Sequence, residues 1–300
     1  MAPTAPTART ARTARTAHAR RLRGALAALL LGATTALPLG VTAAPAAASP
    51  AAAPTAAATD LAGTVALGNC SGALVRTPDA GPDDPALVLT NGHCLESGMP
   101  EPGRVIVDRP SSRSLTLLAA GGREAATLRT ARIVYATMTG TDLAVYRLTT
   151  SYREIEDRHG VRPLEIAAAR GTPGARIDVV SGYWKRVYSC RLDGFVHELH
   201  EDGWVMRDSL RYTSGCDTAP GTSGAPVVDR ETGRVIGVNS TANRGGTPCA
   251  LHSPCEVDGN GDTTTRRGIA YGQQVHALTG CVTAGGRLDL TLPACTLPKP

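Results

Sequence analysis

Short runs of apolar and β-branched residues alternate with turn residues over most of the chain. Gly, Pro, Asp and Asn separate the runs, which is typical of β-strands joined by tight turns. Eight segments have this pattern: 64–75, 86–93, 114–120, 142–149, 175–184, 203–213, 224–230 and 233–240. No long segment has the helical period, so an all-β barrel or sandwich is expected. A short helix is expected at 270–280, where Gly280 would end it.

The first part of the chain has a different pattern. Its only charged side chains are the arginines Arg9, Arg12, Arg15, Arg20, Arg21 and Arg23, and an apolar run and small residues follow at 25–41 and 42–49. This order predicts a secretory signal peptide over residues 1–44. A membrane span is the alternative, but a proline and two glycines interrupt this run of 17 residues, which is short for a bilayer core of about 30 Å. We therefore expect a secreted, extracellular protein without stable membrane insertion after signal removal. The Arg20-Arg21 pair allows a twin-arginine route.

Removal of the signal changes the charge of the protein. The chain carries a net charge of +5, but six arginines and no acid precede Asp60, so the rest is near −1. The sequence therefore gives no indication of a nucleic-acid partner. Residues 45–59 are only Ala, Pro, Ser and Thr, which predicts a linker or pro-segment. Residues 60–300 are long enough for one domain of two lobes, and the lobes are expected to divide near 165–175.

All cysteines lie in this domain, at positions 70, 94, 190, 216, 249, 255, 281 and 295. An even number of cysteines in an exported chain indicates disulfides, although eight cysteines allow 105 connectivities. Zinc binding is the alternative, but no pair has the C-x-x-C spacing. We expect no metal and no cofactor.

Three residues are candidates for nucleophilic catalysis. Ser223 lies between Gly221 and Gly224 in "CDTAPGTSGAPVV", where a serine alone would be an ordinary turn residue. His93 follows an apolar strand and precedes Cys94, which could anchor the imidazole. Asp142 begins a strongly apolar strand, where a carboxylate is costly to bury without a partner. The order His, Asp, Ser distinguishes one of the common serine-hydrolase arrangements.

Two other patterns have simpler explanations. His197 and His200 in "FVHELHEDGW" lack the spacing of a zinc-protease helix and indicate a hairpin that turns at Asp202-Gly203. The segment "DGNGD" at 258–262 resembles the start of a calcium loop but lacks its later Gly and Glu. An Asn/Gly/Asp turn is the preferred interpretation there, with weak calcium binding left open.

The segments "LTNGHC", "TDLAVYRL" and "PGTSGAPV" resemble the histidine, aspartate and serine motifs of the chymotrypsin-like (trypsin-like) serine proteases. The resemblance extends over about residues 64–282. It implies two six-stranded antiparallel β-barrels with the active site in the cleft between them. It also implies Ser223 as nucleophile, His93 as general base and acid, Asp142 as its orienting acid, and the amides of Gly221 and Ser223 as oxyanion hole. Protein or peptide substrates and a monomer are expected.

The resemblance further implies a disulfide between Cys70 and Cys94. The segment "CDTAPGTSGAP" resembles the bacterial branch that includes glutamyl endopeptidases, which implies a second disulfide between Cys190 and Cys216. Pairing of Cys249 with Cys255 and of Cys281 with Cys295 is a further expectation.

Substrate preference is left open by the sequence. Asp217 stands where trypsin-like enzymes hold the carboxylate that selects Arg or Lys, which favours basic residues slightly. An Asp-Thr pair here also resembles the glutamyl-specific branch, in which Thr218 would line the pocket and Asp217 would point away. That branch carries a histidine where this chain has Asn239, followed by Ser240. Asp217, Thr218, Asn239 and Ser240 are the predicted substrate-binding residues.

Two features bear on activity itself. Thr222 replaces the Asp that in many animal members pairs with a new N-terminus after activation cleavage. Activity is therefore expected not to depend on a free N-terminus. A catalytically silent binding or adhesion module on the same fold is the alternative function.

Overall fold

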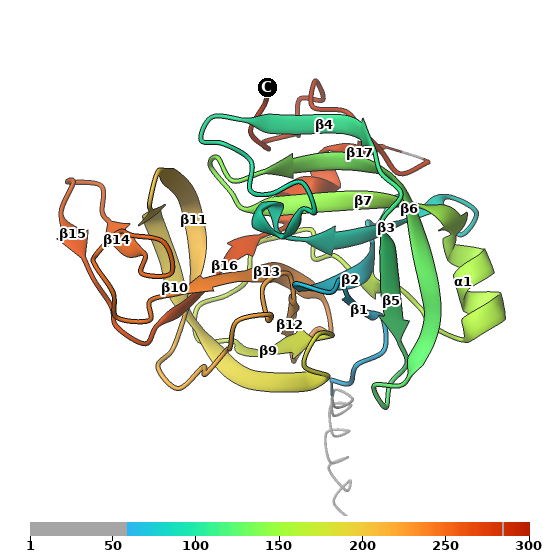
Figure 1. The fold of residues 1–300 in the computed structure, drawn as a ribbon, viewed down its shortest axis with the longest axis horizontal. Helices are drawn as coiled ribbons and strands as arrows, with labels where there is room; N and C mark the ends of the chain where they lie inside the picture. Colours follow the sequence, from blue (N-terminus) through green and yellow to red (C-terminus); the bar gives the residue numbers. More distant parts are fainter. Residues whose placement is uncertain (1–58, 284) are drawn as a thin grey trace, which may run out of the picture. The chain divides into compact units, whose positions relative to one another are not determined.

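The computed structural model describes residues 59–283 and 285–300 (Figure 1). The expected signal peptide, 1–44, lies outside this part of the chain. So does the expected linker, 45–59, apart from its last residue.

Six antiparallel strands of the N-terminal half form a closed barrel. Its strands are β1 (Thr64–Ala66), β2 (Ser71–Arg76), β3 (Pro85–Thr90), β5 (Ser114–Leu118), β6 (Glu124–Thr137) and β7 (Leu143–Ser151). They pair in the order β1, β2, β3, β7, β6, β5 and back to β1. Strand β4 (Val105–Pro110) pairs with β6, and β8 (Leu164–Glu165) runs parallel to β2. Leucine and valine side chains fill the interior together with Tyr146.

The C-terminal half forms a second closed ring of six antiparallel strands. These are β9 (Arg176–Ser181), β10 (Arg186–Glu201), β11 (Trp204–Tyr212), β12 (Pro226–Asp229), β13 (Val235–Ala242) and β16 (Ala270–Gln274). The ring runs β9, β10, β11, β16, β13, β12 and back to β9. The hairpin of β14 (Cys255–Val257) and β15 (Thr263–Thr264) extends β10, and β17 (Val282–Thr283) pairs with β18 (Arg287–Leu288). The predicted fold of two six-stranded barrels is confirmed.

The helices differ from the prediction. Residues 270–274 of the expected C-terminal helix form β16, because pairing with β11 and β13 buries Tyr271 completely in the second barrel. Only the 3-10 helix η2 (His276–Gly280) remains helical. A second helix, α1 (Tyr152–His159), was not predicted. It begins with a capping box between Ser151 and Glu154 and ends at Gly160, whose φ is +65°.

All eight cysteines form disulfides, in the four pairs expected from the sequence. The bond between Cys70 and Cys94 joins positions 24 residues apart and fixes the segment next to His93. A closed loop of this length typically stabilises a protein by about 3–4 kcal/mol. Among the described residues, no helix is long and apolar enough to cross a membrane.

Candidate active site

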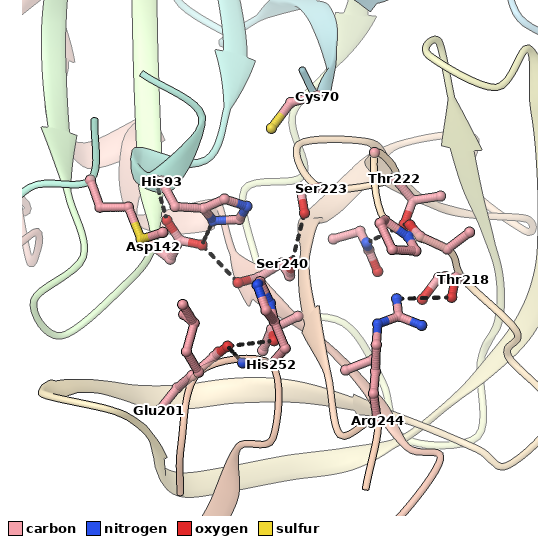
Figure 2. Close-up of a pocket in the computed structure, with 18 of the residues that line it drawn as sticks. Cys70, His93, Asp142, Glu201, Thr218, Thr222, Ser223, Ser240, Arg244 and His252 are labelled. Carbon is pink, nitrogen blue, oxygen red and sulfur yellow. Dashed lines mark hydrogen bonds and ion pairs between the residues drawn. The ribbon is translucent and has the colours of Figure 1, made fainter. Parts of the chain in front are cut away.

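His93 and Asp142 meet at one end of the first barrel. His93 lies in the 3-10 helix η1 (Gly92–Cys94), directly after β3, and Asp142 directly precedes β7. The His93 Nδ1 atom lies 2.7 Å from Asp142 Oδ2, and the His93 backbone N–H donates to Oδ1 at 3.1 Å (Figure 2). A Cβ at Gly92 would lie 2.2 Å from the Thr137 carbonyl oxygen, so only glycine allows this close approach.

Asp142 is a buried carboxylate with several donors. Its side chain is 1% exposed, and the Ser240 hydroxyl donates to Oδ2 at 2.7 Å. Burial alone would raise the pKa of Asp142, but the His93 ring and the Ser240 hydroxyl outweigh it and lower the pKa below its usual value. Burial in turn opposes the charged form of His93, but Asp142 and, more weakly, Glu201 raise the pKa of His93 above 6.5. The imidazole is therefore a stronger base than a free histidine.

Ser223 reaches the same place from the second barrel, on the loop before β12. Its hydroxyl donates to the Ser240 backbone carbonyl at 3.0 Å rather than to the His93 ring. Its own carbonyl accepts the Ser71 N–H of the first barrel at 2.7 Å. Gly224, with φ +81°, lets the two barrels approach, since a Cβ there would lie 2.0 Å from the Ser71 carbonyl oxygen.

The backbone beside Ser223 presents two free donors. The N–H groups of Gly221 and Ser223 donate to no atom of the described residues, whereas those of Thr222 and Gly224 donate to the carbonyls of Ala219 and Asn239. Gly221 has φ +91°, a conformation that glycine adopts without strain. Two unpaired donors next to a nucleophile can stabilise a developing oxyanion.

A cavity of about 320 Å³ contains this constellation. Its apolar side is formed by Met99, Met138, Met206 and Leu251, and its polar side includes Glu201, Arg244 and His252. Glu201 is 5% exposed and accepts bonds from the Thr241 hydroxyl and the His252 N–H at 3.0 and 2.7 Å (Figure 2). Burial raises the pKa of this carboxyl above its usual value.

Three of the four predicted substrate-binding residues line the cavity, namely Thr218, Asn239 and Ser240. Asp217 does not line the cavity and is exposed to solvent. The chain reverses there, because the Thr218 N–H donates to the carbonyl of Cys216, which is itself buried and bonded to Cys190. This reversal corrects the expectation that the Asp217 carboxylate acts inside the pocket.

Several residues of the site gave no signal in the sequence. Glu201 and Arg244 lie outside the three motifs, and no local pattern distinguishes them. Arg113 is buried and donates to the carbonyls of Leu67 and Cys94, both at 2.8 Å, which braces the chain next to His93. A lone arginine in a polar loop is usually a surface residue, so this role needs the structure.

The described residues offer little to a metal ion. The Sγ atoms of Cys70 and Cys94 and a ring nitrogen of His93 lie within 4.8 Å of one another, but both sulfurs belong to a disulfide. The segment 258–262 is a turn, in which Asp258 Oδ1 accepts the N–H groups of Asn260 and Asp262 at 2.8 and 2.9 Å. The carboxylate thus binds its own backbone. His197 and His200 lie on β10 of the predicted hairpin with β11.

Comparison with known proteins places the chain in a family. Among solved structures it is similar to the Rv3671c protease of M. tuberculosis in its active form, with 17% identity over 82% of this chain and 87% of that one and a TM-score of 0.43. It is also similar to the MamO protease domain of Magnetospirillum magneticum, with 14% identity, coverage of 75% and 98%, and a TM-score of 0.47. A third similar structure is the serine protease neuropsin of mouse brain, with 16% identity over 73% of this chain and 92% of that one and a TM-score of 0.43. Among curated proteins no sequence matches. The family model "Trypsin-like peptidase domain" matches residues 70–238, and the chain therefore belongs to this family.

Proposed function

We propose that the protein is a secreted serine endopeptidase that acts through an acyl-enzyme on Ser223. The observation that carries the proposal is the bond between His93 Nδ1 and the buried Asp142 carboxylate, in the same cavity as Ser223 and its two unpaired N–H groups. Four disulfides agree with an oxidising, extracellular compartment. We expect a monomer that acts on protein or peptide substrates.

The residues divide the reaction as follows. The Ser223 hydroxyl rotates from the Ser240 carbonyl toward His93, loses its proton to Nε2 and attacks the peptide carbonyl carbon. Asp142 holds the proton on Nδ1 and stabilises the imidazolium that forms. The N–H groups of Gly221 and Ser223 bind the oxyanion, and each such donor is typically worth about 3 kcal/mol of transition-state stabilisation. His93 then gives the proton to the leaving amine. In the second half of the reaction His93 takes a proton from a water molecule, which attacks the ester carbon of the acyl-enzyme, and the proton returns to Ser223 Oγ as the acid product leaves.

The residues that line the cavity favour an acidic side chain before the scissile bond over a basic one. Asp217 lies outside the cavity, whereas Arg244 lines it and donates to the Thr218 carbonyl at 3.3 Å. Among the described residues no carboxylate lies within ion-pair distance of Arg244. A substrate carboxylate could therefore pair with this guanidinium.

A silent binding module on the same fold is the second candidate. The observation in its favour is that the Ser223 hydroxyl donates to Ser240 and not to His93. Hydrogen bonds of catalytic groups often form only when substrate is bound, so we prefer the peptidase.

Cleavage-site mapping by mass spectrometry tests both candidates. The mature protein and its Ser223→Ala variant are incubated with a denatured protein mixture. Cuts that vanish in the variant, predominantly after Asp or Glu, are the expected result. Cuts after Arg or Lys would refute the preference alone, and identical products from both proteins would refute the peptidase.

A further inference from the structure

The loop before Ser223 contains a tight turn with a defined orientation. The Thr222 N–H donates to the Ala219 carbonyl at 3.0 Å, which closes a four-residue turn around Pro220 and Gly221. Proline in the second position and a glycine with φ +91° in the third indicate type II. Types I and II differ mainly in the orientation of the central peptide group, here the one between Pro220 and Gly221. That group carries one of the two donors proposed for the oxyanion.

An exposed tryptophan binds this peptide group from outside. The Trp184 indole Nε1–H, from the turn between β9 and β10, donates to the Pro220 carbonyl at 2.8 Å. In a trans peptide the C=O and the following N–H point in opposite directions. A Pro220 carbonyl held by Trp184 therefore turns the Gly221 N–H to the other side, where it has no partner among the described residues.

The tryptophan is itself held in place. Its backbone N–H donates to the Ser181 hydroxyl at 3.1 Å, and its ring meets the Tyr183 ring edge-on with centroids 5.1 Å apart. Tyr183 lies so close to Gly221 that a Cβ there would be 2.8 Å from its ring. The Trp184 side chain is nevertheless half exposed, with 51% of the residue accessible. Hydrophobic burial thus explains little of the position of the indole ring. The directional contact of this ring is the hydrogen bond from Nε1–H to the Pro220 carbonyl.

The other hydrogen bonds of the turn also join uncharged groups. The Thr222 hydroxyl donates to the Ala219 carbonyl at 2.6 Å and accepts from Asn239 Nδ2 at 3.1 Å. The Gly221 carbonyl accepts the Ser71 hydroxyl at 2.9 Å. These bonds hold the two ends of the turn, whereas Trp184 is the one described residue that donates to the Pro220 carbonyl and so holds the central peptide group.

We propose that Trp184 is a positioning residue, which holds the Pro220–Gly221 peptide so that the Gly221 N–H faces the reacting oxygen. The inference rests on the proposed function and extends it to the contact that keeps the oxyanion site formed in the absence of substrate. A typical net hydrogen bond corresponds to a roughly two- to twelvefold change in a population or a rate. Loss of the indole N–H should reduce catalysis by a factor in this range.

Trp184→Phe tests the proposal, because it keeps an aromatic ring and removes the donor. Tyr183→Phe is the matched control, since the Tyr183 hydroxyl forms no hydrogen bond within the described residues. For wild type and both variants, kcat and KM are measured on one peptide substrate. The affinities of the matching peptide aldehyde and of the matching peptide amide are measured in parallel, and thermal unfolding and the pH profile of kcat/KM complete the comparison. The aldehyde forms a tetrahedral adduct with Ser223 whose oxygen occupies the oxyanion site, whereas the amide only binds.

The expected result is a fall in kcat and in aldehyde affinity by the same factor in Trp184→Phe. KM, amide affinity, the acid limb of the pH profile and the unfolding temperature should stay near wild type, and Tyr183→Phe should behave like wild type. Equal aldehyde affinity in wild type and Trp184→Phe would overturn the proposal. So would parallel losses of aldehyde and amide affinity, which indicate a general structural role. A wild-type protein that neither cleaves peptide nor binds aldehyde would instead refute the proposed function, and the inference with it.

Discussion

Removal of the Ser240 hydroxyl tests the network behind His93. Ser240 Oγ and His93 Nδ1 both lie 2.7 Å from the same oxygen of Asp142. The residue Ser240 is 4% exposed and the Asp142 side chain 1% exposed, so bulk water does not replace the lost donor. Within the part of the chain that the structure describes, Ser240→Ala therefore leaves the imidazole as the one side-chain donor to Asp142 Oδ2.

The size of the effect follows from the kind of bond. A hydrogen bond to a charged group contributes about 1.5–3 kcal/mol, which corresponds to a roughly 10- to 150-fold loss of kcat/KM if the whole contribution acts on the transition state. The stability effect depends on pH. Because the pKa of Asp142 is lowered in the folded state, its contribution is present above the unfolded value of 3.8 and disappears as the pH falls through the folded pKa.

The assay compares kcat/KM and thermal unfolding in wild type, Ser240→Ala and Ser209→Ala. Ser209 is the matched control, because its buried hydroxyl bonds to Gln273 in the second barrel at 3.2–3.3 Å and does not line the active-site cavity. Ser240→Ala should lose activity strongly, and Ser209→Ala should lose stability alone. Wild-type activity in Ser240→Ala, or an equal loss in Ser209→Ala, would refute the role of this hydroxyl.

Three further predictions concern the backbone, the charge and the N-terminus of the site. Gly224→Ala should unfold at lower denaturant concentration than Gly215→Ala. Both glycines have positive φ, but a Cβ added at Gly224 would lie 2.0 Å from the Ser71 carbonyl oxygen, whereas a Cβ added at Gly215 would have no atom within 4 Å. The Gly215 change should cost about 1–2 kcal/mol, and equal midpoints would refute the packing argument. Activity should rise with pH as His93 loses its proton, and the pH profile should have its inflection above 6.5. Glu201→Gln should move that inflection to lower pH, because the variant lacks a negative charge that favours the imidazolium. An inflection at the same pH in both proteins would contradict this role of Glu201. Residues added before Asp60 should leave kcat/KM unchanged, and loss of activity in such an extended protein would show that a free N-terminus is needed.

The sequence predicted the features that are local or come from short motifs. The eight predicted segments each overlap a strand of the structure, and the hairpin after His200 is present, because both depend on nearby residues. Strands β4 and β6 were not predicted, since charged residues interrupt their runs of apolar residues. The helix expected at 270–280 was wrong because pairing with two distant strands buries Tyr271, and local propensity does not contain that energy. The helix α1 was not predicted because its eight residues are too few to show a helical period, although Ser151 and Glu154 form a recognisable capping box.

The site shows the same limit. Asp217 and Thr218 are neighbours in the sequence, and only the reversal of the chain after Cys216 decides which one faces the cavity. Glu201, Arg244 and Trp184 come from other strands and loops, so their approach depends on the closure of the second barrel. Such residues have no fixed spacing from the catalytic motifs, and their roles become visible only in three dimensions.

Covalent labelling of Ser223 is the most direct test of the proposed mechanism. A peptidyl diphenyl phosphonate with an acidic residue next to phosphorus forms a bond between Ser223 Oγ and phosphorus and releases phenol. Mass spectrometry of the digested protein should find the adduct on Ser223 in wild type, and no adduct in His93→Ala or in denatured wild type. An unlabelled wild-type protein, or equal labelling of all three samples, would contradict an activated serine at this site.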